Sequence, residues 1–132
     1  SNTKILSVGV VKANQFYGNF TGPIDGVTLA TYSSSFTASA GVPVGIDTFA
    51  KSSYDAVEYT IYFSNGSNIQ SQKVLVMDNN TTAFSNEYAL MYNSSQIVNI
   101  SADVDGSNIK LKATPLTGVS GATSYTWSRT LL

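Results

Sequence analysis

The stretch that decides the fold is "DAVEYTIYFSNGSNIQSQKVLVMD", residues 55–78. Its first half alternates in character: Val57, Tyr59, Ile61 and Phe63 form one set, with Glu58, Thr60 and Tyr62 between them. Successive side chains of a strand point to opposite faces, so this alternation predicts a half-buried strand. The "SNGSN" segment (64–68) that follows contains residues that tolerate positive φ, which predicts a hairpin turn into a partner strand at 69–78.

The same pattern of strand and turn continues to residue 132. Turn clusters at 78–82, 93–96 and 105–108 separate the strand-like segments 83–92, 97–104 and 109–115. A flexible loop is expected at 117–124 ("TGVSGATS"), followed by a last strand whose Tyr125 and Trp127 share one face and should pack inward. Strands separated by turns at roughly 8–12-residue spacing indicate a sandwich or barrel. We therefore expect an all-β fold, an antiparallel, jelly-roll-like β-sandwich over residues 34–132.

The N-terminal part is different. In "FYGNFTGPIDGV" (16–27) an apolar residue recurs every fourth position, and each is followed two places later by glycine. A helix is excluded, because each glycine costs about 1 kcal/mol and a proline about 3 kcal/mol. One such chain buries too little apolar area to offset its ordering entropy, at about 25 cal/mol per Å².

We therefore expect identical chains to wind together here, as an oligomeric stalk. The residues expected on the common axis are Val10, Phe16, Phe20, Ile24 and Val27. A disordered glycine-rich leader is the alternative interpretation. The polar stretch from Thr31 to Ser35 suggests the boundary, which divides the chain into a stalk segment (1–33) and a sandwich domain (34–132).

Composition excludes several classes of function. Only 11% of the residues are charged and the net charge is −1, so no basic patch is available to bind nucleic acid. No apolar run approaches the roughly 20 residues that span a bilayer, so we expect no membrane insertion. Cysteine is absent, which rules out disulfides and thiolate zinc sites.

Little in the sequence points to catalysis. Histidine is absent, which excludes a Ser-His-Asp triad and histidine metal sites. Glu58 and Glu87 are the candidate carboxylate pair for a glycosidase, but pairing of a strand carboxylate with Lys73 or Arg129 is the simpler interpretation. The "DVDG" segment (103–106) echoes a calcium loop but lacks its remaining ligands, so a turn is expected. We predict no catalytic residue, no metal, no cofactor and no enzyme activity.

Contacts with a ligand or receptor are expected at hairpin tips and exposed tyrosines. Loop tips commonly carry binding functions, and tyrosine offers a flat apolar ring with a hydroxyl. The candidate residues are Tyr62, Asn65, Asn68, Asn79, Asn80 and Tyr92. The alternative is that tyrosines fill contacts within the sandwich and between subunits.

The segment "VGVVKANQFYGNFTGPIDG" (8–26) resembles the tetrapeptide stalk repeats of tail-fibre and other virion structural proteins of T4-like phages, especially those of marine cyanobacteria. Residues 46–84, "EYALMY" (87–92) and "SRT" (128–130) are similar to a C-terminal domain that often follows such stalks. The resemblance implies a homotrimeric fibre in the virion, whose β-sandwich tip serves host attachment or virion assembly.

The partners implied are the chain itself and a host-surface glycan or protein. Two alternatives stay open. One is a monomeric carbohydrate-binding module that uses exposed tyrosines and turn loops. The other is an adhesin or S-layer-type domain.

Overall fold

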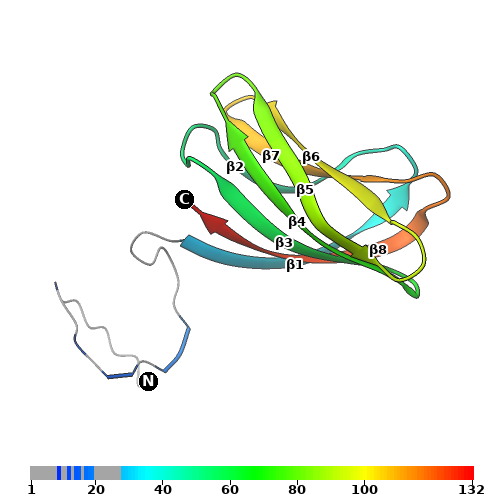
Figure 1. Ribbon diagram of the computed structural model, residues 1–132, viewed down its shortest axis with the longest axis horizontal. Helices are drawn as coiled ribbons and strands as arrows, with labels where there is room; N and C mark the ends of the chain where they lie inside the picture. Colours follow the sequence, from blue (N-terminus) through cyan, green and yellow to red (C-terminus); the bar gives the residue numbers. More distant parts are fainter. Residues whose placement is uncertain (1–8, 10–11, 13, 16, 20–27) are drawn as a thin grey trace, which may run out of the picture.

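The computed structural model describes residues 9, 12, 14, 15, 17–19 and 28–132. Every regular element in this part of the chain is a β-strand (Figure 1). The strands are β1 (Thr28–Ser39), β2 (Val44–Ala50), β3 (Val57–Asn65), β4 (Asn68–Asp78), β5 (Ala83–Tyr92), β6 (Val98–Asp105), β7 (Asn108–Pro115) and β8 (Ser120–Leu131).

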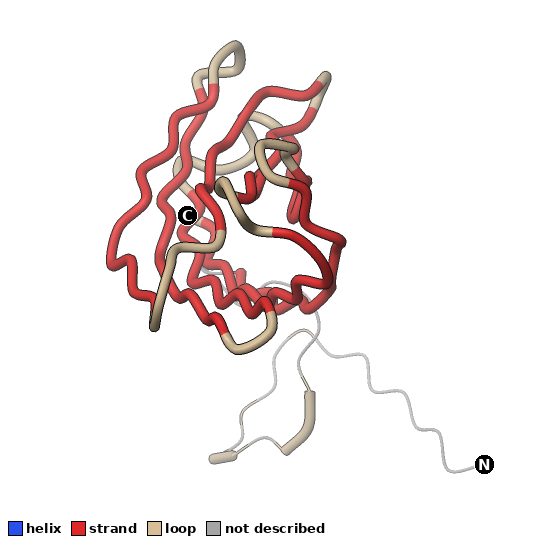
Figure 2. The backbone as a smooth tube through the Cα atoms, turned by 90° about the vertical axis from the view of Figure 1, so that its right-hand side faces the viewer, coloured by secondary structure: helices blue, strands red, loops and turns tan. Residues whose placement is uncertain are grey.

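The strands form two packed sheets, which Figure 2 shows from the side. The larger sheet has the order β1-β8-β3-β4-β5 and the smaller has the order β2-β7-β6, with antiparallel pairing throughout. The expected all-β antiparallel sandwich is therefore confirmed. The two sheets contain different numbers of strands, since β3, β4 and β5 form consecutive hairpins within the larger one. This division does not establish a jelly roll, which stays a prediction.

The core lies between the sheets and contains the residues that the alternation predicts. Val57, Tyr59, Ile61 and Phe63 of β3 are all buried, and so are Tyr125 and Trp127 of β8. They pack against a cluster from the smaller sheet that includes Ile100, Ile109 and Leu111. Each fully buried large apolar side chain contributes about 1.5–3 kcal/mol, so this layer is the main source of stability.

The predicted hairpin turns are also confirmed. Gly66 has φ of 59° in the β3–β4 turn and Gly106 has φ of 61° in the β6–β7 turn. Glycine adopts this left-handed conformation without a Cβ penalty. The strand predicted at 83–92 coincides with β5.

Two parts of the sequence interpretation need correction. Residues 31–35, taken as a polar interruption, lie within β1, and β8 begins at Ser120 inside the expected loop 117–124. The reason is that β1 is an edge strand paired with β8 along its whole length, so ladder hydrogen bonds hold residues that lack apolar alternation. Ser33, for example, exchanges a 2.8 Å hydroxyl hydrogen bond with Thr126.

The structure does not test the predicted stalk. The residues expected on its axis, Val10, Phe16, Phe20, Ile24 and Val27, all lie outside the described residues for which side chains are placed. The trimeric stripe therefore stays a prediction, as does the division into residues 1–33 and 34–132, although β1 already begins at Thr28.

A buried glutamine connects the two sheets where β6 begins. The Gln70 side-chain oxygen accepts hydrogen bonds from the backbone N–H groups of Ile97 at 2.7 Å and Val98 at 3.1 Å. Its amide group donates to the Val98 carbonyl at 3.0 Å and to the Gln72 side chain at 2.6 Å. The polar atoms of Gln70 thus replace the strand partner that β6 lacks on this side.

The connections between strands lie at two opposite ends of the sandwich (Figure 1). At the proximal end β1 begins, β8 ends, and the β2–β3, β4–β5 and β6–β7 connections lie. At the distal end lie the β1–β2, β3–β4, β5–β6 and β7–β8 connections. The N-terminal leader therefore joins the sandwich at the end opposite the β3–β4 hairpin tip.

Candidate functional site

The predicted contact residues divide between the two ends. Asn65 and Asn68 flank the distal β3–β4 turn, and Tyr62 and Tyr92 lie towards the same end. Asn79 and Asn80 belong to the β4–β5 turn at the proximal end. Since β4 runs the length of the sheet between these turns, four of the six predicted residues lie towards the distal end, in two separate depressions.

The two proximal asparagines form their own turn. The Asn79 side-chain oxygen accepts hydrogen bonds from the N–H groups of Thr81 at 3.1 Å and Thr82 at 2.8 Å. Asn80 has a positive φ of 75°, and its N–H donates to Asp78 at 3.0 Å. Asparagine suits both positions because it mimics a backbone turn and tolerates the left-handed region. Their role in the structure is to shape the turn.

Tyr62 and Tyr92 line one depression near the distal end, which we call the distal depression. It has a volume of about 300 Å³ and is also lined by Ile69, Met91 and Asn93. Tyr62 is 43% exposed and Tyr92 is 50% exposed, so both rings meet solvent. Exposed tyrosine rings with hydroxyl tips are suited to stack on sugars while hydrogen-bonding their edges.

Asn65 and Asn68 line a second hollow of about 460 Å³, bordered by residues 95–97 and 116–119. The Asn65 amide donates to the Ser120 carbonyl at 3.0 Å and to the Thr123 hydroxyl at 2.7 Å. The Asn68 side-chain oxygen accepts the Ser94 hydroxyl at 2.5 Å. Asn65 therefore ties the hairpin to β8, and Asn68 ties it to the β5–β6 connection, a role that the sequence interpretation as contact residues did not include.

Asn93 completes this bracing. Its side-chain oxygen accepts the Ile69 N–H at 2.9 Å, and its amide donates to the Ser67 carbonyl at 2.8 Å. Sequence reasoning placed it only in a turn at 93–96. Its position directly after a strand could have indicated this bracing role, because asparagine side chains there often hydrogen-bond to free backbone groups. The β3–β4 and β5–β6 connections are thereby held together beside the distal depression.

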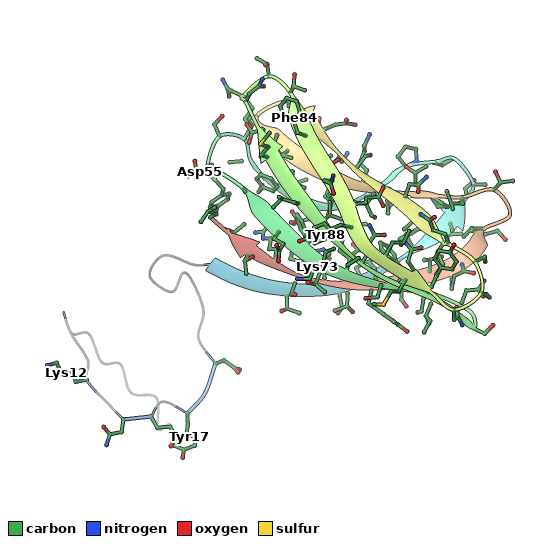
Figure 3. The ribbon with its side chains drawn as sticks, in the orientation of Figure 1. Lys12, Tyr17, Asp55, Lys73, Phe84 and Tyr88 are labelled. Atoms are coloured by element: carbon green, nitrogen blue, oxygen red, sulfur yellow. The ribbon has the colours of Figure 1, made fainter. Side chains whose placement is uncertain are left out.

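The candidate carboxylate pair does not share a cleft. Glu58 accepts hydrogen bonds from Tyr88 at 2.8 Å and Lys73 at 3.2 Å on the outer face of the larger sheet (Figure 3). The Tyr88 hydroxyl, and then Lys73, hold the pKa of Glu58 below its usual value. Glu87 pairs across from buried Val74 and accepts a hydrogen bond from Gln72 at 2.9 Å, so it lies on the opposite face. The pairing of Glu58 with Lys73 is confirmed.

The remaining acidic candidates are also in ion pairs. Asp103 pairs with Lys112, and Asp105 lies 3.6 Å from Lys110, beside the confirmed β6–β7 turn. Among the residues that the structure describes, no group of three or more His, Cys, Asp or Glu side chains could hold a metal ion. The described part of the chain likewise contains no helix with the length and apolar character needed to cross a membrane.

One polar cluster was missed by sequence reasoning. Asp47 of β2 accepts hydrogen bonds from the Tyr59 hydroxyl at 2.6 Å and from Arg129 at 2.5 Å, all between the sheets. The Arg129 guanidinium lies 5.3 Å from the Trp127 ring centre. Burial, and then the Asp47 charge, raise the pKa of Tyr59 well above its usual value. Because Asp47 and Arg129 are far apart in the chain, no local pattern indicates their pairing.

An apolar surface covers the proximal part of the larger sheet's outer side; Figure 3 labels one of its residues, Phe84. We call it the proximal apolar surface and define it by Ala56, Leu75, Met77, Phe84 and Leu132. Two shallow depressions of about 360 and 180 Å³ share Ala56 and Leu75, which makes the surface continuous. Leu75 and Phe84 are each 43% exposed. Contiguous exposed apolar residues of this kind mark interaction surfaces.

No protein-family model matches the chain, and no curated protein does. Solved structures of phage tailspike proteins do resemble it. The Acinetobacter phage vB_ApiP_P1 tailspike matches 96% of this chain and 24% of its own, at 17% identity and a TM-score of 0.51. The Acinetobacter baumannii phage AM24 tailspike matches 80% of this chain and 26% of its own, at 9% identity and a TM-score of 0.46.

A third structure is tailspike gp49 of Acinetobacter baumannii bacteriophage Fri1, described as a capsular polysaccharide depolymerase. It matches 83% of this chain and 18% of its own, at 10% identity and a TM-score of 0.48. The chain thus spans about a quarter or less of the length of these tailspikes. At these identities the likeness is one of fold alone. This β-sandwich is similar in fold to one part of the vB_ApiP_P1 tailspike.

Proposed function

We propose that the chain is a non-enzymatic tail protein of a bacteriophage virion, the end of a trimeric fibre or spike that attaches to a host-surface glycan. The observation that carries this proposal is the similarity of fold between 96% of the chain and part of the vB_ApiP_P1 phage tailspike. Because the chain covers only 24% of that tailspike, we assign it the role of one domain in a longer attachment structure.

Attachment is supported by the position of the distal depression. Tyr62 and Tyr92 lie towards the end opposite the start of β1, where the leader joins the sandwich. A fibre tip needs its contact surface away from its stalk. In a trimer, three weak contacts gain effective concentration on a surface with many copies of the same glycan.

Self-association is supported by the proximal apolar surface. Leu75, Met77 and Phe84 are exposed on the larger sheet near the end at which β1 begins. If a second copy of the chain packs against this surface as well as along the predicted stalk, the apolar area is removed from water. The predicted stripe of Val10, Phe16, Phe20, Ile24 and Val27 would continue the same interface along the leader.

Mass in solution tests the trimer. The 14.0 kDa chain should scatter light as a species of three times that mass at micromolar concentration. Phe20→Asp should lower the mass and leave the β-sheet circular dichroism unchanged, and Leu75→Asp should weaken association as well. Ser33→Asp, on the polar β1 edge of the same sheet, is the matched control. A monomer mass for the wild-type chain would contradict the proposed assembly.

Glycan attachment needs a separate test. The wild-type chain should bind at least one member of an immobilised panel of purified bacterial capsular polysaccharides and lipopolysaccharides. Tyr62→Ala and Tyr92→Ala should lose that binding, whereas Tyr88→Ala, which removes an exposed tyrosine midway along the edge strand β5, should retain it. The non-enzymatic assignment predicts no new reducing ends in the bound polysaccharide over hours of incubation. Their appearance would show a depolymerase.

The second candidate is a monomeric carbohydrate-binding module. It is favoured by the distal depression, where the exposed rings of Tyr62 and Tyr92 lie together. A monomer mass together with glycan binding that depends on Tyr62 would select this alternative.

A further inference from the structure

A separate depression opens on the side of the sandwich where the edge strands β1 and β2 face each other. β1 ends the larger sheet and β2 ends the smaller, and no strand in the described part of the chain closes the space between them. The depression has a volume of about 380 Å³. Its lining residues are Tyr32, Gly45, Ile46, Asp47, Thr48, Lys110, Tyr125 and Trp127. None of these was predicted as a contact residue, and the distal depression shares none of them.

One wall of the depression is aromatic and fixed in place. Tyr32 is 50% exposed, and its ring centre lies 5.6 Å from that of Trp127 and 6.3 Å from that of Tyr125. Trp127 is held by a 2.9 Å hydrogen bond from its indole N–H to the Ile46 carbonyl. The buried rings support Tyr32 from behind, so it offers an apolar face to solvent with little freedom to lose on binding. Such a face matches the C–H side of a pyranose ring.

The opposite side provides charged and polar groups. Tyr59 and Arg129 both bond to Asp47 Oδ2, and within the described part of the chain this leaves Oδ1 as an acceptor for a ligand hydroxyl. Lys110 lies across Gly45, where an added Cβ would come within 2.8 Å of the Lys110 Cε atom. The glycine therefore leaves room for the lysine stem, whose ammonium group is 3.6 Å from Asp105 and can donate to a sugar oxygen.

We propose that this depression, the β1–β2 site, binds one pyranose unit of a saccharide, a conclusion that rests on the proposed function for the class of ligand but concerns a different surface. The sugar ring stacks on Tyr32, and its hydroxyl groups donate to Asp47 and accept from Lys110. The volume lies at the lower end of the range of about 300–1,000 Å³ that is typical of small-molecule sites. A polysaccharide with repeated units can contact this site on one copy and the distal depression on the same or another copy, which strengthens binding by multivalency.

Variants at Tyr32 and Lys110 test the site, with the immobilised polysaccharide panel and matching free oligosaccharides as probes. Tyr32→Ala should weaken binding about fivefold, since a well-placed aromatic contact is worth about 1 kcal/mol. Tyr32→Phe keeps the ring and should bind within about twofold of the wild type. Lys110→Met should also weaken binding, and Tyr88→Ala is the unaffected control. Free oligosaccharide should change the fluorescence of Trp127, the only tryptophan, in the wild type.

The outcomes separate this site from the proposed function. If Tyr32→Ala and Lys110→Met bind like the wild type while Tyr62→Ala does not, the β1–β2 site is overturned and distal attachment stands. If the Tyr32 and Lys110 variants lose binding and the Tyr62 and Tyr92 variants keep it, the β1–β2 site is supported and the distal contact is wrong. If the wild-type chain neither binds the panel nor changes its fluorescence, both proposals fall.

Discussion

The Tyr59 hydroxyl of β3 donates a 2.6 Å hydrogen bond to the Asp47 carboxylate of β2, and this contact joins the two sheets through the core. A carboxylate placed between sheets loses most of its hydration, so it needs both this donor and the Arg129 charge. In the described part of the chain the Arg129 Nε atom is buried without a hydrogen-bond partner. Asp47 is therefore the group on which the stability of the whole cluster depends.

Asp47→Asn should destabilise the fold strongly, because it leaves the Arg129 charge largely buried without its counter-ion. Removing one partner of a buried pair costs roughly 3–5 kcal/mol, and we expect about 3 because both side chains keep some exposure. Urea unfolding followed by circular dichroism measures this. Asp103→Asn, which breaks the exposed pair with Lys112, is the matched control and should cost less than about 1 kcal/mol. Equal losses for both variants would contradict the assigned role.

Alkaline pH should destabilise the chain through Tyr59. Its folded-state pKa is raised, while in the unfolded chain it titrates near 10.0. Above that pH the unfolded state has lost a proton that the folded state keeps, so the free energy of unfolding falls as pH rises. Below it this contribution is fully present. Urea midpoints at roughly pH 9 and pH 11 should therefore differ more for the wild type than for Tyr59→Phe. An identical pH dependence in the two proteins would show that Tyr59 titrates normally.

Gln70→Leu should loosen the start of β6, because it leaves the N–H groups of Ile97 and Val98 without their buried partner. The Val98 carbonyl loses the Gln70 amide but keeps the Gln96 amide at 2.9 Å. Each unsatisfied buried group costs about 1–3 kcal/mol, so a total of roughly 3 kcal/mol or more is expected. Hydrogen exchange should show lost protection at the amides of Ile97 and Val98. The control is Gln96→Ala, at a partly exposed glutamine, which should cost less than about 1 kcal/mol. Unchanged protection at both amides would refute the bracing role.

Asn79→Ala should lower stability by about 1 kcal/mol, because its side chain accepts hydrogen bonds from Thr81 and Thr82 within the turn. Glycan binding and solution mass should not change, since the residue shapes the proximal turn. Thermal unfolding gives the first quantity, and the polysaccharide panel and light scattering give the others. Lost glycan binding with wild-type stability would instead support Asn79 as a contact residue.

The features that could be predicted from the sequence are those encoded over a few residues. Alternation in β3 identified Val57 and Phe63 as core, and the Asn-Gly pair at 65–66 located a hairpin. The first strand was missed because an edge strand held by ladder bonds needs no apolar alternation, as Ser33 shows. Alternation of apolar residues indicates a strand with one buried face, so it does not identify a strand that buries few apolar side chains.

Contacts between residues that are distant in the sequence could not be predicted, because they depend on strand register and on long-range pairing. Glu58 and Glu87 are each followed by a tyrosine in the sequence, yet the two glutamates lie on opposite faces of the sheet. Asparagines in the turns were identified as polar and exposed, but Asn65 and Asn79 are engaged by backbone and side-chain groups nearby. The β1–β2 site combines residues from four strands, so no single segment indicates it.

The long β1–β8 ladder has a mechanical consequence. All twelve residues of β1 pair with β8, and the leader enters at the first of them, Thr28. If the distal end is anchored and tension comes from the leader, the pull runs parallel to these strands. The hydrogen bonds between β1 and β8 are then loaded in shear, so all of them resist the force at the same time. Loading in shear lets a small domain withstand a larger pulling force. A force at right angles to β1 would instead break the same hydrogen bonds one after another.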